Sequence, residues 1–550
     1  MLGLLALTLL TAREFWQQPE IPRIAQLPAA LIGIVLLQVS LGKVAYFDQA
    51  LLYALYLLFA ALLMVLGAKL RDFFGLTRLA QMLAIFLLTG AALNAGVGVL
   101  QHFQWRTLLD SVITAKISPF LYGNIAQHNH FANYITMGLI SLGLLFQQGK
   151  LRAVHVVVLA ALLLFVLTLS GSRSSWLYLL MMSGMAWWLA RRDAALRPLL
   201  NYSLSLIAGF GLMHLVVLLP FMAGTDSSTN TVERLYGELL SNEGSTIWIK
   251  FYMWHEAWLM FMQSPWLGVG FGQFAWHHFQ LLPELRPDNI SGFYTNAHNL
   301  IFQFAAEAGL GGLLALSGSL GIWFYGLRHA TPSAAHWWGY AVLGVLAIHS
   351  LLEYPLWYAY FVAIAAILLG AFDETRYRLK LHNAGRISLA MILLLGLLSL
   401  IQLRSGYQQL KDTLALRSVS GNFAEVFPLI RNGLNAVGGS LLSPYAEMYI
   451  LSYTEVNTDH IKQKLALGAN VMHLMPIAQV VYRQAFFLAQ DGQLAQAKQL
   501  LEQAIWSYPG NGDAHQLLVS LAEKDPAHFS ALLEFAAQKE QEHARAVRPQ

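Results

Sequence analysis

Residues 153–190 read AVHVVVLAALLLFVLTLSGSRSSWLYLLMMSGMAWWLA, with two apolar runs on either side of a short polar turn. A helix needs roughly 20 apolar residues to cross the hydrocarbon core of a bilayer, and each run approaches that length. The stretch therefore predicts a tight hairpin of two membrane-spanning helices, at 153–170 and 175–190, with the turn Ser170–Ser175 at the membrane surface.

The composition of the whole chain agrees with this hairpin. Of 550 residues, 57% are hydrophobic and only 12% are charged, and the mean hydropathy is +0.51. Soluble domains carry about 45–50% apolar and about 25% charged residues, so a soluble protein of this size could not cover its surface. We expect a polytopic membrane protein. A net charge of +4 is too small to indicate nucleic-acid binding, and the absence of cysteine excludes disulfides and a thiol nucleophile.

The same length criterion predicts an all-α protein with about twelve transmembrane helices. The apolar start of the chain, residues 1–10, is interpreted as most of the first one, because it lacks the basic residues of a cleaved signal peptide. The other predicted spans are approximately 27–42, 49–70, 79–103, 130–147, 153–170, 175–190, 199–224, 299–327, 336–353, 357–372 and 388–403.

Basic residues in the short loops fall on one side of the membrane if these spans alternate in direction, and the positive-inside rule assigns that side to the cytoplasm. They are Arg13, Arg23, Lys69, Arg71, Arg78, Lys150, Arg152, Arg191, Arg192, Arg197, Arg328, Arg376, Arg378, Lys380 and Arg386. Because no eukaryotic targeting signal is present, we expect a bacterial inner (cytoplasmic) membrane. The segment 104–129, the turn Ser170–Ser175, the long loop 225–298, the turn Glu353–Tyr358 and the tail then face the periplasm.

Residues 1–403 are expected to form the transmembrane domain, and residues 404–550 a helical domain in the periplasm. In the tail, polar and charged residues return and apolar residues recur at helical spacing. Residues 482–509 resemble a tetratricopeptide helix pair, which cannot bury its apolar face alone. A small helical cap and a tetratricopeptide-like array both remain open, and either offers a docking surface for a partner.

Polar residues on the outer side are the candidates for a site, because polar groups at membrane depth are costly and usually mark a site or a water-filled cavity. Gln127, Asn129 and His130 offer neutral donors and acceptors for sugar hydroxyls or phosphate oxygens. The alternative is a plain helix start that Asn129 caps. Arg173 suits an anion beside serine hydroxyls, or it is an interfacial arginine that reaches the lipid headgroups.

The long loop adds the cations Arg234 and Lys250 near the membrane face. Its stretch 264–272, SPWLGVGFG, lacks the spacing and the lysine of a phosphate-binding loop, so we expect its glycines to permit a close turn against another segment. His277 and His278 are adjacent, so only one of them can face a given point. We expect a structural or surface role for this pair.

The end of the loop holds the candidate catalytic residue. Thr295 or Asn296 is expected to cap the next helix. His298 then lies in or next to the first turn, where the positive end of the helix dipole disfavours a charged imidazole. A neutral imidazole is what a general base requires. The alternative is a histidine that is merely hydrogen-bonded at a helix start.

The turn Glu353–Tyr358 interrupts an apolar stretch with a proline. Tyr354 and Tyr358 suit either an aromatic belt or a stacking surface for sugar rings. The Glu353 carboxylate needs a partner at this depth, an arginine or His298. No HExxH or paired-carboxylate spacing occurs on the outer side, so neither a metal nor another cofactor is predicted.

Five stretches in this order resemble the O-antigen ligase superfamily and, within it, the bacterial O-linked oligosaccharyltransferases of the PglL type. Each stretch alone is a weak signal, whereas five in family order are specific. They are QHNHFANY (127–134), SGSRSSW (170–176), SPWLGVGFGQFAW (264–276), TNAHNLIFQFAAEAGLGG (295–312) and HSLLEYPLWYAYF (349–361). The tail resembles the extra C-terminal region of the members that modify pilins.

The resemblance implies a GT-C-like membrane glycosyltransferase. Its donor is a glycan on an undecaprenyl-pyrophosphate carrier, and its acceptor is Ser or Thr of a periplasmic, type IV pilin-like protein. It further implies metal-independent, inverting catalysis, with the family's essential histidine at His298, its arginine at Arg173 and its amide at Gln127. The family's aromatic corresponds to Tyr354 or Tyr358.

One position departs from the family. Many members carry arginine where this chain has Lys250, so either Lys250 or Arg234 takes that phosphate-binding role. Asn129 and His130 are expected to assist in donor binding, and Asn299 and Glu353 to position glycan or acceptor. A pyrophosphate leaves with two negative charges, so cations that hold it most strongly as it departs lower the barrier.

Three other functions remain possible from the sequence. A polymerase of the same superfamily would join glycan to glycan, and a ligase would attach O-antigen to lipid A core; the tail favours protein as the acceptor. A lipid or glycan transporter predicts broken helices near mid-bilayer and repeated halves, neither of which the sequence indicates.

Overall fold

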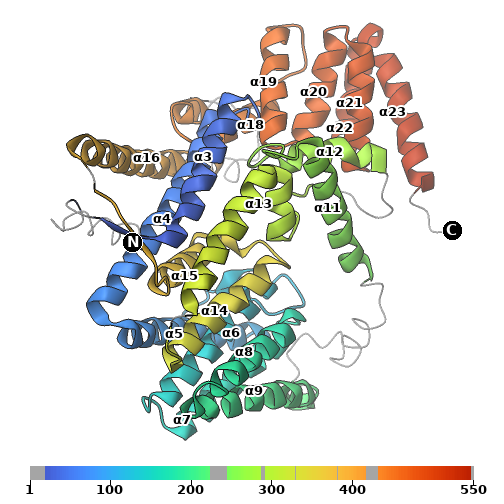
Figure 1. The fold of residues 1–550 in the computed structure, drawn as a ribbon. Helices are drawn as coiled ribbons and strands as arrows, with labels where there is room; N and C mark the ends of the chain where they lie inside the picture. The colour runs from blue at the N-terminus through green and yellow to red at the C-terminus, as the bar shows by residue number, and fades with distance from the viewer. Residues whose placement is uncertain are drawn as a thin grey trace.

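The computed structural model describes residue 16 and residues 19–222, 244–285, 292–328, 330–380, 382–415 and 432–546. Across these residues the chain is mostly helical (Figure 1). Every predicted span from 27 onward overlaps a helix, and the span predicted at 1–10 lies outside the described residues. These helices are α3 (Gln26–Ser40), α4 (Phe47–Phe74), α5 (Leu76–Phe103), α6 (His128–Gln147), α7 (Ala153–Leu169), α8 (Ser174–Ala190), α9 (Arg197–Val216), α13 (Leu300–Leu327), α14 (Ala334–Ser350), α15 (Ala359–Ala371) and α16 (Asn383–Ala415).

Several of these helices can cross a membrane. Among the described residues, six are long and apolar enough: α4, α5, α13, α16, and α3 and α9 with their preceding turns. The helices α7 and α15 are apolar but shorter. A helix that is apolar on all sides, like α7, is stable only when lipid or other helices surround it. The prediction of a polytopic integral membrane protein is confirmed, and the number of spans stays a prediction.

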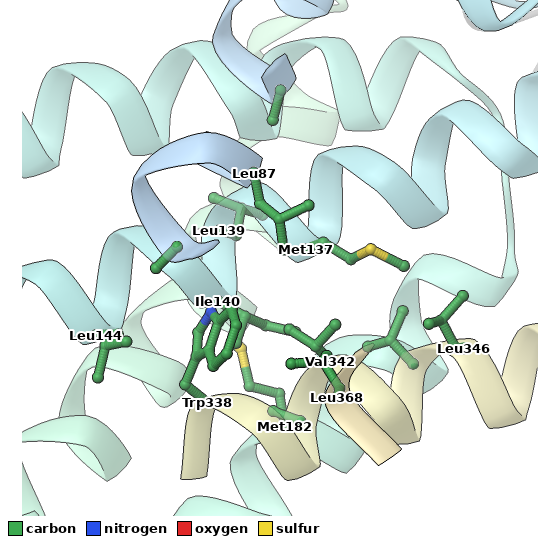
Figure 2. Close-up of a cluster of buried hydrophobic side chains, with 14 of the residues drawn as sticks. Leu87, Met137, Leu139, Ile140, Leu144, Met182, Trp338, Val342, Leu346 and Leu368 are labelled. Atoms are coloured by element: carbon green, nitrogen blue, oxygen red, sulfur yellow. The ribbon is translucent and has the colours of Figure 1, made fainter. Parts of the chain in front are cut away.

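Most of the spans pack around a core that surrounds α6, whereas α3 packs in a separate cluster with Phe271 and Phe304. Figure 2 shows part of the core around α6: Leu87, Met137, Leu139, Ile140, Leu144, Met182, Trp338, Val342, Leu346 and Leu368. Helices α4 and α15 touch backbone to backbone, since a side-chain carbon on Gly67 would overlap Ile367 and one on Gly370 would overlap Met64. Small residues permit this close approach in membranes, where van der Waals packing drives helix association.

A short sheet and several ion pairs join the elements at one end of the bundle. Strands β1 (Glu20–Pro22) and β2 (Arg376–Arg378) pair antiparallel, so the prediction of a purely helical chain is wrong here. Arg71 pairs with Glu374 at 2.8 Å, and Arg376 contacts the Asp72 carboxylate. These basic residues were all assigned to the cytoplasmic side. The α5 helix starts at this end, and its 28 residues extend about 42 Å away from it.

The part of the long loop that the structure describes is largely helical. It forms α11 (Gly244–Gln263), which packs along α13, and α12 (Phe274–Leu285). The glycine-rich stretch between them turns closely against α13, as predicted. Gly268 has φ +69°, and a side-chain carbon there would overlap the Glu307 backbone. The Lys43 ammonium fixes the same turn by donating to the Gly268 carbonyl at 3.0 Å.

Helix α13 is broken, whereas the sequence predicts one continuous span over 299–327. Gly309 has φ 61° and ψ −155°, which only glycine adopts readily. The glycine-rich turn compensates for the break: the Pro265 carbonyl accepts from Leu310 N at 2.7 Å, and the Trp266 carbonyl accepts from Gly311 N at 3.0 Å. The part after the break, residues 310–327, is about 27 Å long and can span the membrane by itself.

The C-terminal helices stand together at one end of the molecule (Figure 1). They are α18 (Ser443–Tyr453), α19 (Ile461–Leu474), α20 (Ala478–Gln490), α21 (Leu494–Ser507), α22 (Gly512–Lys524) and α23 (Pro526–Ala546). They share an apolar core, and Phe279 of α12 contributes to it. The predicted boundary at 403 falls inside α16. The predicted pair in 482–509 corresponds to α20 and α21, and its assignment to the tetratricopeptide class stays a prediction.

Candidate active site

The Glu353 carboxylate joins three segments that are distant in the sequence. His298 Nδ1 lies 3.0 Å from Glu353 Oε2, while Lys250 Nζ lies 3.3 Å and Asn129 Nδ2 lies 3.0 Å from Glu353 Oε1. Only 6% of Glu353 is exposed. Its partner was expected to be His298 or an arginine; it is His298, together with a lysine. Four predicted site residues are therefore in direct contact.

The electrostatics of this cluster keep the carboxylate ionised. Burial raises the pKa of Glu353, but the hydrogen bond from His298 and the charge of Lys250 outweigh it and lower the pKa to about 2. An ionised carboxylate can only accept, so His298 Nδ1 carries the hydrogen and donates it. In the neutral imidazole, Nε2 then has a free lone pair, which is the form that a general base needs.

The backbone at His298 has an unusual conformation, just before the start of α13. His298 has φ 51°, a left-handed conformation that is uncommon for a residue other than glycine. Asn299 caps α13: its Oδ1 accepts from Ile301 N at 3.0 Å and from Phe302 N at 3.3 Å. The predicted caps Thr295 and Asn296 are therefore wrong, because the helix begins at residue 300. His298 lies just outside the first turn.

The start of α6 differs from its prediction in the same way. Gln127 is the cap and accepts from His130 N. Asn129 lies inside the helix, which frees its side chain to bridge Glu353 and Ser172; Ser172 Oγ donates to Asn129 Oδ1 at 2.8 Å. The alternative in which Asn129 only caps a helix is wrong. The bridge brings the turn before α8 next to the site.

Two of the three predicted phosphate-binding cations lie within the described residues, and they have different surroundings. Arg173 is exposed and directly precedes α8. Lys250 is half-buried and donates to the Leu352 carbonyl at 2.6 Å in addition to its contact with Glu353. An ammonium has three donors, and two of those on Lys250 have partners among the described residues. Arg234 lies outside the described residues.

Aromatic rings line the site beside His298. The Tyr354 ring meets the His298 ring edge-on at 4.8 Å, and Tyr354 and Tyr358 are stacked at 6.1 Å. Burial raises the pKa of Tyr354 to about 12, so its hydroxyl stays protonated. The Asn299 amide donates to the Leu351 carbonyl at 3.1 Å and thereby ties the start of α13 to the Glu353 turn.

Sequence reasoning missed a buried polar chain below these rings. His130 Nδ1 lies 2.7 Å from His349 Nε2, and His349 Nδ1 lies 2.9 Å from the Tyr178 hydroxyl. All three side chains are fully buried. His130 also contacts the Tyr358 ring at 4.7 Å. The position of His349, one helical turn before Glu353, was the available signal.

Of the adjacent histidines, for which a structural or surface role was expected, His278 lies in the interior. It is fully buried, and its Nδ1 lies 2.8 Å from Oε2 of Glu256, which is also buried. Burial lowers the pKa of the neighbouring His277 to about 4. Within the described ranges, no three His, Asp or Glu side chains converge in a way that could hold a metal ion.

Fold and site together define a multi-pass membrane protein with a polar, histidine-containing site at the ends of its helices. The model of the O-antigen ligase family matches residues 158–317. A second family model, described as the C-terminal part of virulence factor membrane-bound polymerases, matches residues 337–523. The two matches confirm that the chain resembles the O-antigen ligase superfamily, as its motifs indicated.

Two relatives from Acinetobacter baylyi (strain ATCC 33305 / BD413 / ADP1) refine this assignment. A general O-oligosaccharyltransferase is 26% identical over 354 residues, which cover 64% of this chain and 61% of the relative. A ComP-specific O-oligosaccharyltransferase is 23% identical over 377 residues, which cover 67% and 64%. The chain thus matches less than two thirds of the length of either. They confirm the resemblance to the PglL type, and no solved structure matches the chain.

Proposed function

We propose that this protein is an O-oligosaccharyltransferase. It moves a preassembled glycan from an undecaprenyl-pyrophosphate carrier to a Ser or Thr hydroxyl of a periplasmic acceptor protein. The observation that carries the proposal is the contact between Glu353 and His298, Lys250 and Asn129. This contact holds a general base, His298, and a cation, Lys250, on the same carboxylate. The two O-oligosaccharyltransferase relatives support the same chemistry.

In this proposal the proton of the acceptor hydroxyl goes to His298 Nε2. Glu353 accepts from Nδ1 and stabilises the imidazolium that forms, as the carboxylate does in other histidine–carboxylate pairs. The hydroxyl oxygen bonds to the anomeric carbon while the bond from that carbon to the pyrophosphate oxygen breaks. Attack from the opposite face inverts the configuration, and no covalent enzyme intermediate is required.

The leaving pyrophosphate is assigned to Arg173 and Lys250, with Gln127 and Asn129 nearby. His130, predicted for the same role, is fully buried and contacts His349 instead. Charge that develops on a departing group is best stabilised by cations already held in place. The Asn129–Ser172 bond supports this assignment, because it brings the turn that carries Arg173 next to the Glu353 cluster. Arg234 lies outside the described residues, and its proposed role in phosphate binding stays as the sequence predicts it.

The site is proposed to face the periplasm of an inner membrane. The basic residues that the positive-inside rule assigns to the cytoplasm include Arg71 and Arg376, at the end of the bundle where α5 begins. Gln101, near the other end of α5, donates to the Gly123 carbonyl at 3.1 Å, just ahead of Gln127. The length of α5 therefore separates the basic residues assigned to the cytoplasm from the candidate active site. A site that faces the periplasm requires this separation.

The C-terminal helices are proposed to hold the acceptor protein, which we expect to be pilin-like. The test is intact-mass measurement of co-expressed candidate pilins in cells with one defined lipid-linked glycan. A mass increase equal to that glycan, present only with this protein, supports the proposal. An unchanged pilin mass together with elongated lipid-linked glycan would favour polymerisation instead, the second candidate, which the match to the polymerase C-terminal family supports.

A further inference from the structure

His298 lies at the end of an irregular segment, residues 292–299, which connects the C-terminal helices to the site. At the start of this segment, Gly292 N donates to the carbonyl of Ser507, the last residue of α21, at 2.8 Å. At its end, His298 contacts Glu353. The segment therefore contacts the C-terminal helices at one end and the proposed catalytic cluster at the other.

A buried histidine–glutamate pair lies beside the start of this segment. His278 Nδ1 lies 3.0 Å from Glu256 Oε1 and 2.8 Å from Glu256 Oε2. The other ring nitrogen of His278 lies 3.4 Å from the Gly292 carbonyl oxygen, and the ring meets the Tyr294 ring edge-on at 5.3 Å. No more than 1% of either side chain is exposed. The pair is thus outside the reach of substrate but in contact with the segment that ends at His298.

The helices that carry this pair also contact both regions. Helix α11 carries Glu256, and its Trp254 Nε1 donates to the Ala297 carbonyl at 3.0 Å, next to His298. Helix α12 carries His278, and its Phe279 is buried in the core of the C-terminal helices. On the same helix, the Trp276 ring lies 4.5 Å from the ring of His473.

The conformation of His298 requires such support. A left-handed backbone conformation is unfavourable for a residue with a side chain, so the neighbouring structure must hold it. Trp254 fixes the residue before His298 from one side, and the Gln303 side chain accepts from Ala297 N at 2.7 Å from the other. The Glu256–His278 pair holds together the two helices on which the start of the segment rests.

We propose that Glu256 and His278 are positioning residues for the transfer reaction, which couple the C-terminal helices to the placement of His298. This inference rests on the proposed function. A buried, hydrogen-bonded pair is costly to break from one side, because the remaining partner is left without its bond. Displacement of a catalytic group by about 1 Å can cost a hundredfold in rate. The pair therefore acts on turnover without touching substrate.

The experiment uses the full chain in detergent with a lipid-linked glycan and a pilin acceptor, and measures kcat and acceptor KM per folded molecule. Glu256→Ala and His278→Ala are expected to lower kcat by about tenfold to a hundredfold and to leave acceptor KM within about threefold. Glu256→Gln is expected to stay near wild type, because its amide oxygen still accepts from His278. Hydrogen exchange of residues 292–299 should be faster in the alanine variants.

The matched control is His336→Ala. His336 is a buried histidine that hydrogen-bonds Ser333 at the start of α14, away from the segment. It should lower the amount of folded protein without changing kcat. If Glu256→Ala behaves like this control, with lower stability but unchanged kcat and exchange, the pair is merely structural and the inference is overturned. An equal loss of kcat in Glu256→Gln would also contradict positioning through the hydrogen bond.

If neither alanine variant folds, Trp254→Phe provides the test. It removes only the donor to the Ala297 carbonyl and keeps an aromatic ring. A fall in kcat with unchanged acceptor KM supports positioning of His298 through this segment, and wild-type kcat overturns it.

The activities of the wild type and of His298→Ala distinguish the proposed function from this inference. An inactive wild type contradicts the proposed function, whereas an active wild type, an inactive His298→Ala and a fully active Glu256→Ala contradict this inference alone.

Discussion

Two regions of the molecule hold the same pair of residue types in almost the same geometry. In one, His298 Nδ1 lies 3.0 Å from Glu353; in the other, His278 Nδ1 lies 2.8 Å from Glu256. The first pair is partly open, with 23% of the His298 side chain exposed. The second is closed, with 1% of His278 exposed. Exposure, not hydrogen bonding, distinguishes a group that can exchange a proton with substrate from one that cannot.

The surroundings of the second ring nitrogen lead to the same distinction. Nε2 of His278 lies 3.4 Å from the Gly292 carbonyl oxygen. For Nε2 of His298, the described part of the chain provides no hydrogen-bond partner, and the Tyr354 ring borders the imidazole at 4.8 Å. The carboxylates differ as well, because Glu353 also receives Lys250 and Asn129. A histidine–glutamate pair thus becomes a candidate catalytic site only where cations and solvent exposure accompany it.

The strongest test of this comparison is His298→Ala. Removal of a general base is expected to lower kcat by about 10²–10⁴-fold, because the acceptor hydroxyl must then lose its proton to water. The measurement is the rate of glycan transfer to a pilin, followed by intact mass. His155→Ala, an exposed histidine on α7, is the matched control and should keep full activity. Transfer at the wild-type rate by His298→Ala would remove the base assignment.

Glu353→Gln tests the carboxylate of the open pair. The amide keeps an oxygen that can accept one hydrogen bond but loses the charge shared by His298 and Lys250. We expect kcat to fall about tenfold to a hundredfold, since the imidazolium loses its counter-charge. The matched variant Glu256→Gln is expected to stay near wild type, because the buried pair needs only the hydrogen bond. Similar kcat values for the two variants would end the distinction between the pairs.

That Glu353 needs a partner could be predicted from the sequence, with His298 or an arginine as the candidates, because burial leaves a carboxylate few options. A charged group in an apolar stretch needs a partner, and few cations and imidazoles are available on the outer side. The close turn at Gly268 followed from its glycines in the same way. Both are consequences of local chemistry, which a sequence displays directly.

The helix caps and the buried chain could not be predicted, because they depend on register and on distant packing. Whether Asn129 or Gln127 caps α6 is a difference of two residues, and local preference favours Asn over Gln as a cap, which here indicates the wrong residue. The contact of His130 with His349 joins α6 to α14 across 219 positions of sequence. The break at Gly309 depends on carbonyls that the loop before α12 supplies. No local sequence pattern indicates the contact between His130 and His349 or the break at Gly309.

Arg173→Ala tests the donor side of the open pair. Loss of one charge-assisted contact to the pyrophosphate is expected to raise the KM for the lipid-linked donor about tenfold. Arg191→Ala is the matched control, because Arg191 follows the opposite end of α8 and lies over the Trp187 ring at 4.0 Å. The alanine variants of the closed pair should leave donor KM unchanged. An unchanged donor KM in Arg173→Ala would make this arginine a contact of lipid headgroups only.

The smallest expected effect is on stability as the pH falls. The pKa of Glu353 is lowered from 4.5 to about 2, so its ionisation stabilises the folded state above about pH 4.5, and this stabilisation is lost as the pH falls towards 2. Between pH 6 and pH 4 the loss amounts to about 1 kcal/mol. Glu353→Gln cannot titrate, so the difference in apparent Tm between wild type and this variant should shrink over that interval. A constant difference would mean that His298 and Lys250 do not hold the carboxylate ionised, and the open pair would then lose the feature that fixes the tautomer of His298.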